Sequence, residues 1–154
     1  MVDNKILAKF LVKAKIKTYA GSGEGAEKKL GNGGRELTFE EGDFSYRDIY
    51  FGFNPFAGEE VVWENGKCIW VMNYCGKIIG SDLPEKEIYE FLQKAMKLID
   101  EERPLRGPQS FKEGNLEYLD NNEGDINSFN GVEKIFYCGK LVYRLYYHGG
   151  LVCN

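Results

Sequence analysis

Apolar residues recur at helical spacing in two segments of the chain. In the first segment, Leu7, Phe10, Leu11 and Ala14 share one face of a helix predicted over residues 4–17, and most of its lysines lie elsewhere. Asn4 or Asp3 can cap this helix.

A second apolar stripe runs from Ile88 to Ile99. It predicts a helix that opens at Leu83-Pro84-Glu85, with Asp82 as its cap, and that ends before Pro104.

Runs of β-branched and aromatic residues between turn signals predict strands in the rest of the chain. The predicted strands and hairpins cover residues 35–39, 44–51, 59–63, 68–74, 111–112, 115–119, 132–137 and 141–147. Asn65-Gly66 is typical of a two-residue hairpin turn, and Cys138-Gly139 occupies the equivalent place later in the chain. Residues 121–127 are expected to form a polar loop, and the glycine-rich stretch Gly21–Gly34 a mobile flap over the sheet.

Several of these segments occur twice in the same order. EGDFSYRD, which ends at Asp48, returns as EGNLEYLD, which ends at Asp120, and Phe56–Gly76 returns as Phe129–Gly149. Such ordered self-similarity predicts the tandem duplication of a helix-plus-three-strand unit. Since neither half alone could bury both faces of a small sheet, we expect an α+β fold with one curved antiparallel sheet and two helices packed on one face. The chain then reads as one domain, 1–154, with pseudo-symmetric halves 4–80 and 81–154.

The repeat places Glu60 in correspondence with Glu133. Side chains alternate along a strand, so Glu60 points with Val62, and Glu133 points with Ile135, toward the predicted interior. Two carboxylates converging on a partly dry cleft between the halves could bind a cationic ligand or move a proton. The alternative is structural: each glutamate caps a turn amide or pairs with a nearby lysine, such as Lys67 or Lys140.

Other candidate residues surround this cleft. Trp70, Tyr74 and Tyr147 lie on the hairpins and could cover a flat ligand, although the same rings are equally typical of a core or of a protein interface. His148, the single histidine, could act as a general base or simply bond a backbone carbonyl. Arg106, in a turn at the rim, could hold an anion or remain a surface charge.

Composition narrows the classes of function. A net charge of −4 without a basic stripe argues against direct nucleic-acid binding, and no apolar run is long enough to span a membrane. We expect no signal peptide, because lysines interrupt the apolar residues near the N-terminus. Four cysteines without a C-x-x-C pair predict no metal site, no cofactor, and reduced, mostly buried thiols in a cytoplasmic protein. The glycine-rich stretch follows a helix rather than a strand, so it does not match a phosphate-binding loop.

Several short phrases carry a resemblance to a known family. They are Thr18-Tyr19-Ala20-Gly21, Phe56-x-Gly58-Glu59-Glu60, Trp70-x-Met72-Asn73-Tyr74, Arg106-Gly107-Pro108, Gly131-x-Glu133 and His148-Gly149-Gly150. Together they resemble an uncharacterised prokaryotic family whose members occur alone or fused behind a Cro/C1-type helix-turn-helix. This chain has no such helix-turn-helix, so the resemblance does not imply DNA binding. The doubled plan is also similar to gyrase-inhibitor-like effector-binding domains, which hold small molecules in a groove between two halves, with a glutamate in it.

These observations lead to a cytoplasmic small-molecule (effector)-binding or sensing module as the main hypothesis. Its predicted ligand-binding residues are Glu60, Glu133, Trp70, Tyr74, Tyr147, His148 and Arg106. Two other classes stay open. One is a small acid/base enzyme that uses Glu60 or Glu133 with His148. The other is a protein–protein interaction module, with a homodimer as one form.

Overall fold

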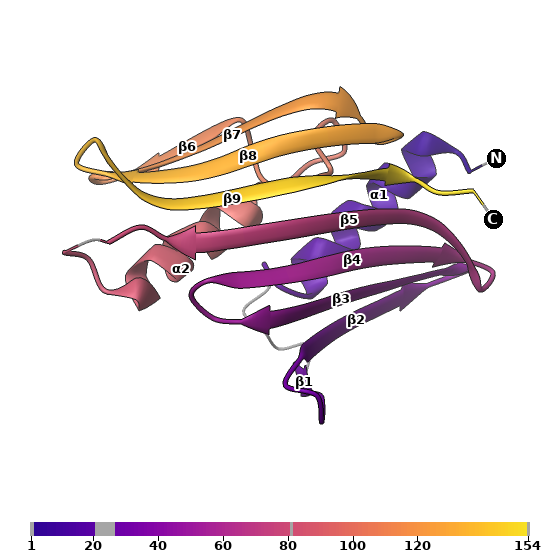
Figure 1. The fold of residues 1–154 in the computed structure, drawn as a ribbon. Coiled ribbons are helices and arrows are strands. Elements are labelled where there is room, and N and C mark those ends of the chain that lie inside the picture. The colour runs from indigo at the N-terminus through magenta and orange to yellow at the C-terminus, as the bar shows by residue number, and fades with distance from the viewer. Residues whose placement is uncertain (1, 21–26, 81, 154) are drawn as a thin grey trace.

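The computed structural model describes residues 2–20, 27–80 and 82–153 (Figure 1). This part of the chain forms an α+β fold with two helices and one antiparallel sheet of nine strands, in the order β1-β2-β3-β4-β5-β9-β8-β7-β6. The elements are α1 (Asn4–Lys17), β1 (Lys28–Lys29), β2 (Arg35–Glu41), β3 (Phe44–Gly52), β4 (Phe56–Glu64), β5 (Lys67–Ile78), α2 (Glu85–Met96), β6 (Ser110–Glu113), β7 (Leu116–Asp125), β8 (Ser128–Tyr137) and β9 (Lys140–Leu151).

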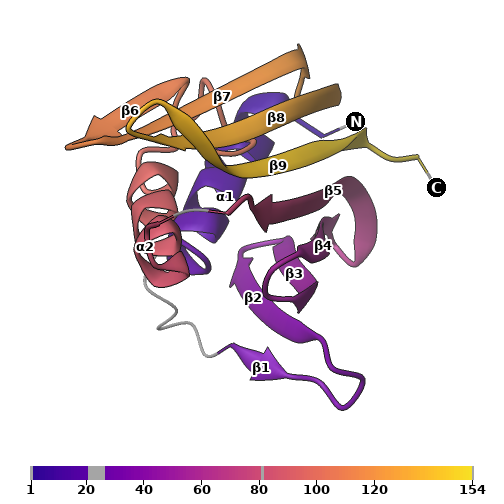
Figure 2. The ribbon, with the colours of Figure 1, turned by 60° about the vertical axis from the view of Figure 1, so that its left-hand side comes forward.

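Both helices lie on the same side of the sheet, which curves around them (Figures 1 and 2). Strands β5 and β9 pair along the middle of the sheet and join the earlier strands to the later ones. Apolar faces of α1 and α2, which include Leu11 and Phe91, pack on buried sheet residues such as Trp70 and Tyr143. Neither helix of the described chain is long and apolar enough to cross a membrane.

The first predicted helix is confirmed. It covers Asn4–Lys17, and the Asp3 side chain accepts hydrogen bonds from the backbone N–H groups of Lys5 and Ile6. One lysine departs from the expected pattern, because Lys15 is buried with the apolar face. This burial brings a cation into the interior, where it contributes to the site described below.

The second helix begins at Glu85, as expected, but its cap was predicted wrongly. Pro84 is the N-cap residue, and it makes no side-chain capping hydrogen bond, so Asp82 does not cap α2. The helix ends at Met96, although Ile99 beyond it is also buried. Helical periodicity therefore continues past the last helical turn, because the segment after α2 still packs on the core.

Both predicted hairpin turns are confirmed. Asn65 and Gly66 have φ angles of 49° and 77°, and Cys138 and Gly139 have φ angles of 48° and 78°. A type I′ turn needs positive φ at both central positions, so the two hairpins turn in the same way. The tolerance of asparagine for this region makes the first turn visible in the sequence, whereas Cys138 is identified only through the repeat.

Other boundaries differ from the prediction. The polar segment after Leu119 is not a loop: Asn121–Asp125 continue β7 and pair with β8, because backbone pairing at the end of the sheet does not require apolar side chains. Five strands, β1–β5, follow α1 and four strands, β6–β9, follow α2, where three were expected after each helix. Within the glycine-rich stretch, Lys28–Lys29 pair with β2, and residues 21–26 lie outside the described residues.

The expectation of mostly buried thiols was also wrong. Cys75, Cys138 and Cys153 are exposed, and Cys68 is partly buried. Cys75 lies next to Tyr74 on β5, so alternation turns its side chain to the outer face of the sheet.

Candidate functional site

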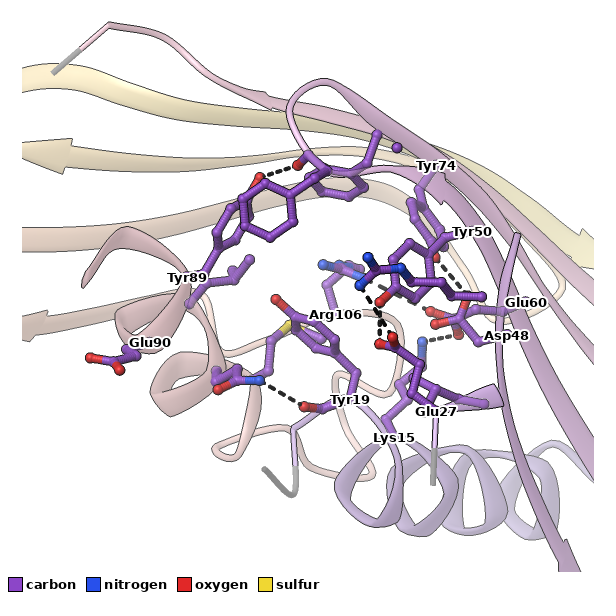
Figure 3. A pocket seen from close by; sticks show the side chains of 18 of the residues that line it. Lys15, Tyr19, Glu27, Asp48, Tyr50, Glu60, Tyr74, Tyr89, Glu90 and Arg106 are labelled. Carbon is purple, nitrogen blue, oxygen red and sulfur yellow. Dashed lines mark hydrogen bonds and ion pairs between the residues drawn. The ribbon is translucent and has the colours of Figure 1, made fainter. Parts of the chain in front are cut away.

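A cavity of about 400 Å³ lies between the concave face of strands β2–β5 and the two helices (Figure 3). Aromatic side chains form much of its wall, namely Tyr19, Tyr50, Phe53, Phe56, Tyr74 and Tyr89. Its inner end is charged, since Lys15, Asp48, Glu60 and Arg106 also line it and all four are buried. The site is therefore an aromatic-walled cavity that ends on buried ionisable groups.

Strand pairing places two carboxylates side by side in this cavity. Asp48 on β3 and Glu60 on β4 are direct partners across the ladder, so both side chains point to the same face. Lys15 reaches up from α1 and forms a buried ion pair and hydrogen bond with Glu60 (Figure 3). Burial lowers the pKa of Lys15, and the charge of Glu60 opposes this shift. The alternative pairing of Glu60 with Lys67 is wrong, because Lys15 holds that position.

Glu133 occupies the corresponding place in the other part of the sheet. Arg106 binds it with two hydrogen bonds, Nε to Oε2 at 3.2 Å and Nη2 to Oε1 at 3.0 Å. The hydroxyls of Tyr118 and Tyr143 also donate to Glu133, at 2.7 and 3.0 Å. Nη1 of Arg106 lies 3.8 Å from Oε1 of Glu60. Arg106 therefore links the two glutamates.

Arg106 was predicted to lie at the rim of the cleft, and this is wrong. The side chain is 6% exposed and lies between the glutamates, at the inner end of the cavity. Burial is the largest single influence and opposes the ionisation of the guanidinium, but Glu133, Tyr143 and Glu60 together outweigh it and hold the pKa of Arg106 well above its usual value. Glu133 pairs with Arg106 rather than with Lys140, so the named lysine is wrong, although both glutamates do form structural ion pairs.

Two aspartates that were not among the predicted site residues, Asp48 and Asp120, complete the arrangement. Tyr74 on β5 passes over Gly58 on β4, and its hydroxyl donates to Oδ1 of Asp48 on β3 at 2.6 Å. A Cβ on Gly58 would lie 2.4 Å from the Tyr74 oxygen, so this path needs a glycine. The signal in the sequence is the repeated motif itself, which ends on Asp48 in one copy and on Asp120 in the other.

The same arrangement occurs at Asp120. Tyr147 on β9 passes over Gly131 on β8 and donates to Oδ1 of Asp120 on β7 at 2.9 Å. Nη2 of Arg103 lies 3.1 Å from the other carboxylate oxygen, Oδ2. Asp120 thus has both a tyrosine and a cation as partners.

Asp48 differs from Asp120 in its charge partners. Among the residues that the structure describes, Asp48 forms no ion pair, and Tyr74 is the hydrogen-bond donor to its side chain. Burial, followed by the neighbouring charge of Glu60, raises the pKa of Asp48 to about 7. Burial and Glu133 raise the pKa of Asp120 to about 6, with Tyr147, Arg106 and Arg103 opposing. Asp48 is therefore a carboxyl group that titrates near neutral pH at a cavity wall.

The structure brings together only part of the predicted site. Glu60, Tyr74 and Arg106 line the cavity, and Glu133 contacts Arg106 behind them. Tyr147 belongs to the Asp120 cluster rather than to the cavity. Trp70 is a core residue whose Nε1 donates to the carbonyl of Ile126 at 3.1 Å.

His148 was also predicted to line the cleft, and this is wrong. It follows the inward-facing Tyr147 on β9, so alternation directs it to the outer face of the sheet, where it is exposed. An acid/base mechanism that pairs His148 with a glutamate across the sheet therefore has no geometric support.

The pKa of Asp48 leads to a testable expectation about stability. A carboxyl whose folded-state pKa lies above its unfolded value destabilises the folded protein as the pH rises through the interval between the two, here from about 4 to about 7. We expect Asp48→Asn to remove this loss. The variant should gain stability relative to the wild type across that interval, on the order of 1–3 kcal/mol by pH 8.

Urea denaturation at pH 4, 6 and 8 measures this difference. Glu59→Gln is the matched control, because Glu59 is exposed on the opposite face of β4 and its removal should leave the pH profile unchanged. A constant offset between Asp48→Asn and the wild type at all three pH values would show that Asp48 is not the titrating group.

The fold and the cavity together define an α+β domain with buried ionisable groups at the end of an aromatic cavity. The family model described as "Domain of unknown function (DUF5680)" matches residues 48–152. This match covers more than half of the chain, so the chain belongs to that family. The matched region begins at Asp48 and includes Glu60, Arg106, Asp120 and Glu133, whereas Lys15 and α1 lie before it. Comparisons with curated proteins and with solved structures give no match.

Proposed function

We propose that this protein is a small-molecule-binding or sensing module whose ligand occupies the cavity between β2–β5 and the helices. The observation that carries the proposal is the combination of size and lining: about 400 Å³, aromatic walls, and a few buried polar groups at one end. Ligand sites in proteins are typically concave, about 300–1,000 Å³ in volume, and mostly apolar with few orienting polar groups. Buried Asp48, Glu60 and Arg106 would orient the polar part of the ligand.

We infer that halves 4–80 and 81–154 derive from a duplicated unit, supported by the matching positions of Asp48 and Asp120, of Glu60 and Glu133, and by the two type I′ turns. A duplicated sensing domain would accord with the resemblance to gyrase-inhibitor-like effector-binding domains and to chains fused behind a helix-turn-helix. In that setting the protein acts in the cytoplasm and does not itself contact DNA.

A second candidate, an acid/base enzyme, is favoured by one observation. Asp48, with its pKa raised to about 7, can both accept and donate a proton near neutral pH, and it lies beside Tyr74 at the cavity wall. In this version Asp48 replaces His148 as the acid/base group. Turnover of a bound compound, lost in Asp48→Asn while binding remains, would distinguish the enzyme from a sensor.

The proposed function can be tested by filling the cavity. Gln93 lines the cavity from α2, and the larger side chain of Gln93→Trp should occupy part of its volume. A compound that stabilises the wild type should then fail to stabilise this variant. At a hundred times its dissociation constant, the loss would correspond to about 2.7 kcal/mol of ligand-dependent stability.

A metabolite library screened by thermal shift provides the measurement. Glu87→Trp is the control, because Glu87 is exposed on the same helix and does not line the cavity. Binding that survives in Gln93→Trp as strongly as in Glu87→Trp would place the ligand elsewhere and contradict the proposal.

A further inference from the structure

The buried carboxylates around the cavity outnumber the cations that pair with them, and this difference indicates what the cavity binds. Among the described residues, four buried carboxylates belong to the cluster, at Asp48, Glu60, Asp120 and Glu133. In the same described part of the chain, three cations pair with them: Lys15 with Glu60, Arg106 with Glu133 and Arg103 with Asp120. The carboxylate left without a cation from the described residues is Asp48, which lines the cavity together with Glu60.

None of the described groups around Asp48 pairs with it as a cation. Those facing it are Glu60 on β4, Tyr74 on β5, Tyr46 on β3, Lys15 on α1 and Arg106 in the segment after α2. Both cations among them are engaged elsewhere, since Lys15 pairs with Glu60 and Arg106 binds Glu133 with two hydrogen bonds. An ionised carboxylate that is buried without a charge partner is strongly unfavourable, so Asp48 takes up either a proton or a cation from outside the chain.

At Asp120, the chain itself supplies a cation of this kind. The surroundings of Asp120 match those of Asp48 in the tyrosine donor and the neighbouring glutamate, and the additional partner is the planar guanidinium of Arg103. Arg103 and Asp120 line a second hollow of about 530 Å³, to which Arg106 also contributes. In this hollow the chain supplies its own cation, whereas at Asp48 the corresponding space is the aromatic cavity.

We propose that the ligand is an organic cation, an amine, amidine or guanidine with a flat apolar body, whose charged group binds Asp48 as Arg103 binds Asp120. This inference rests on the proposed function and specifies its ligand class. The rings of Tyr50, Phe56 and Tyr89 would cover the apolar body, and aromatic faces attract cations in addition. An anionic ligand would instead bring its charge against Asp48, and the cations Lys15, Arg35 and Arg106 of the lining already pair with Glu60, Glu27 and Glu133.

Matched pairs of small compounds test the charge directly. Benzamidine, phenylguanidine and phenethylamine are the cationic probes, and benzamide and benzoate are neutral and anionic compounds of similar shape. Binding is followed at pH 8 by thermal shift and by NMR titration of the ¹⁵N-labelled full chain. At least one cation should bind about tenfold or more tightly than benzamide, and benzoate should bind least, because a hydrogen-bonded charge pair is worth at least that factor.

Asp48→Asn should lower the affinity of the cation about tenfold or more at pH 8 and leave the affinity of benzamide unchanged. Glu59→Gln removes a carboxylate from the opposite, exposed face of β4 and should leave both affinities unchanged. In the wild type, cation affinity should fall as the pH drops below about 7, because the proton and the ligand compete for Asp48. This pH dependence should be absent in Asp48→Asn.

The outcomes separate the two proposals. Tighter binding of benzamide or benzoate than of every cation, with NMR shifts at cavity residues, would overturn the cation assignment and leave the binding function standing. Equal cation affinity in the wild type and in Asp48→Asn would also overturn the assignment. Absence of cavity shifts with every probe and with the metabolite library would overturn both.

Discussion

Replacing Glu133 with glutamine should lower the free energy of unfolding by about 3–5 kcal/mol, the loss seen when one partner of a buried ion pair is removed. Glu133 is 0% exposed and accepts two hydrogen bonds from Arg106 and one each from Tyr118 and Tyr143. A glutamine would leave the Arg106 charge buried and would also lose part of these hydrogen bonds. The total stability of a domain of this size is only about 5–15 kcal/mol, so the effect should be large.

Urea denaturation followed by circular dichroism at pH 7 measures this loss. Glu113→Gln is the control, because Glu113 pairs with Lys94 on the surface, where both side chains are about half exposed and such a pair is worth about 1 kcal/mol or less. If Glu133→Gln is too unstable to purify, the double variant Arg106→Met with Glu133→Leu provides the second measurement. It should recover much of the loss, since replacing a whole buried pair by apolar residues is often neutral. Equal losses in Glu133→Gln and Glu113→Gln would contradict a buried charge at Arg106.

Local periodicity explains why much of the architecture could be predicted. The first helix depends on spacing within fourteen residues, and each hairpin depends on two turn residues between two strands. The inward direction of Glu60 and Glu133 follows from Val62 and Ile135 two positions later, and all four side chains are buried. These features do not depend on what the sheet packs against.

The partners of the glutamates could not be predicted in this way. Lys15 and Glu60 are 45 residues apart in the chain, and Arg106 and Glu133 are 27 apart, so their contacts depend on how the helices lie on the sheet. On the helix, Lys15 follows Ala14 at the edge of the apolar face, and a lysine there is usually solvated. Sequence proximity suggested Lys67 and Lys140 instead, but both lie at hairpin turns away from the inner face.

Two further errors could have been avoided from the amino-acid sequence alone. Tyr147 and His148 are consecutive residues of one strand, so they cannot line the same face, and assigning both to one cleft contradicts the alternation that directs the glutamates inward. The repeat also aligns Asp48 with Asp120. An acidic residue present at the same place in both copies, two positions after an inward tyrosine, is a stronger signal for the site than the single histidine.

Gly131→Ala should lower the free energy of unfolding by about 3 kcal/mol. The added Cβ would lie 2.2 Å from Cζ of Tyr147 and 2.4 Å from its hydroxyl oxygen, so the ring has to move. Overpacking of this kind costs about 1–3 kcal/mol. Displacing the ring also breaks the buried hydrogen bond from Tyr147 to Oδ1 of Asp120, which adds about 1 kcal/mol or more, while Oδ2 keeps Arg103 as its partner.

Gly31→Ala is the matched control for this glycine. A Cβ on Gly31 would meet no atom within 4 Å, so the substitution should change stability by no more than about 0.5 kcal/mol. Coupling to Tyr147 separates ring displacement from a general strand effect: in the double variant with Tyr147→Ala, Gly131→Ala should add little to the loss caused by Tyr147→Ala alone. Additive losses in urea denaturation would mean that the tyrosine does not pass over β8, and the proposed equivalence of the Asp120 and Asp48 clusters would lose its structural basis.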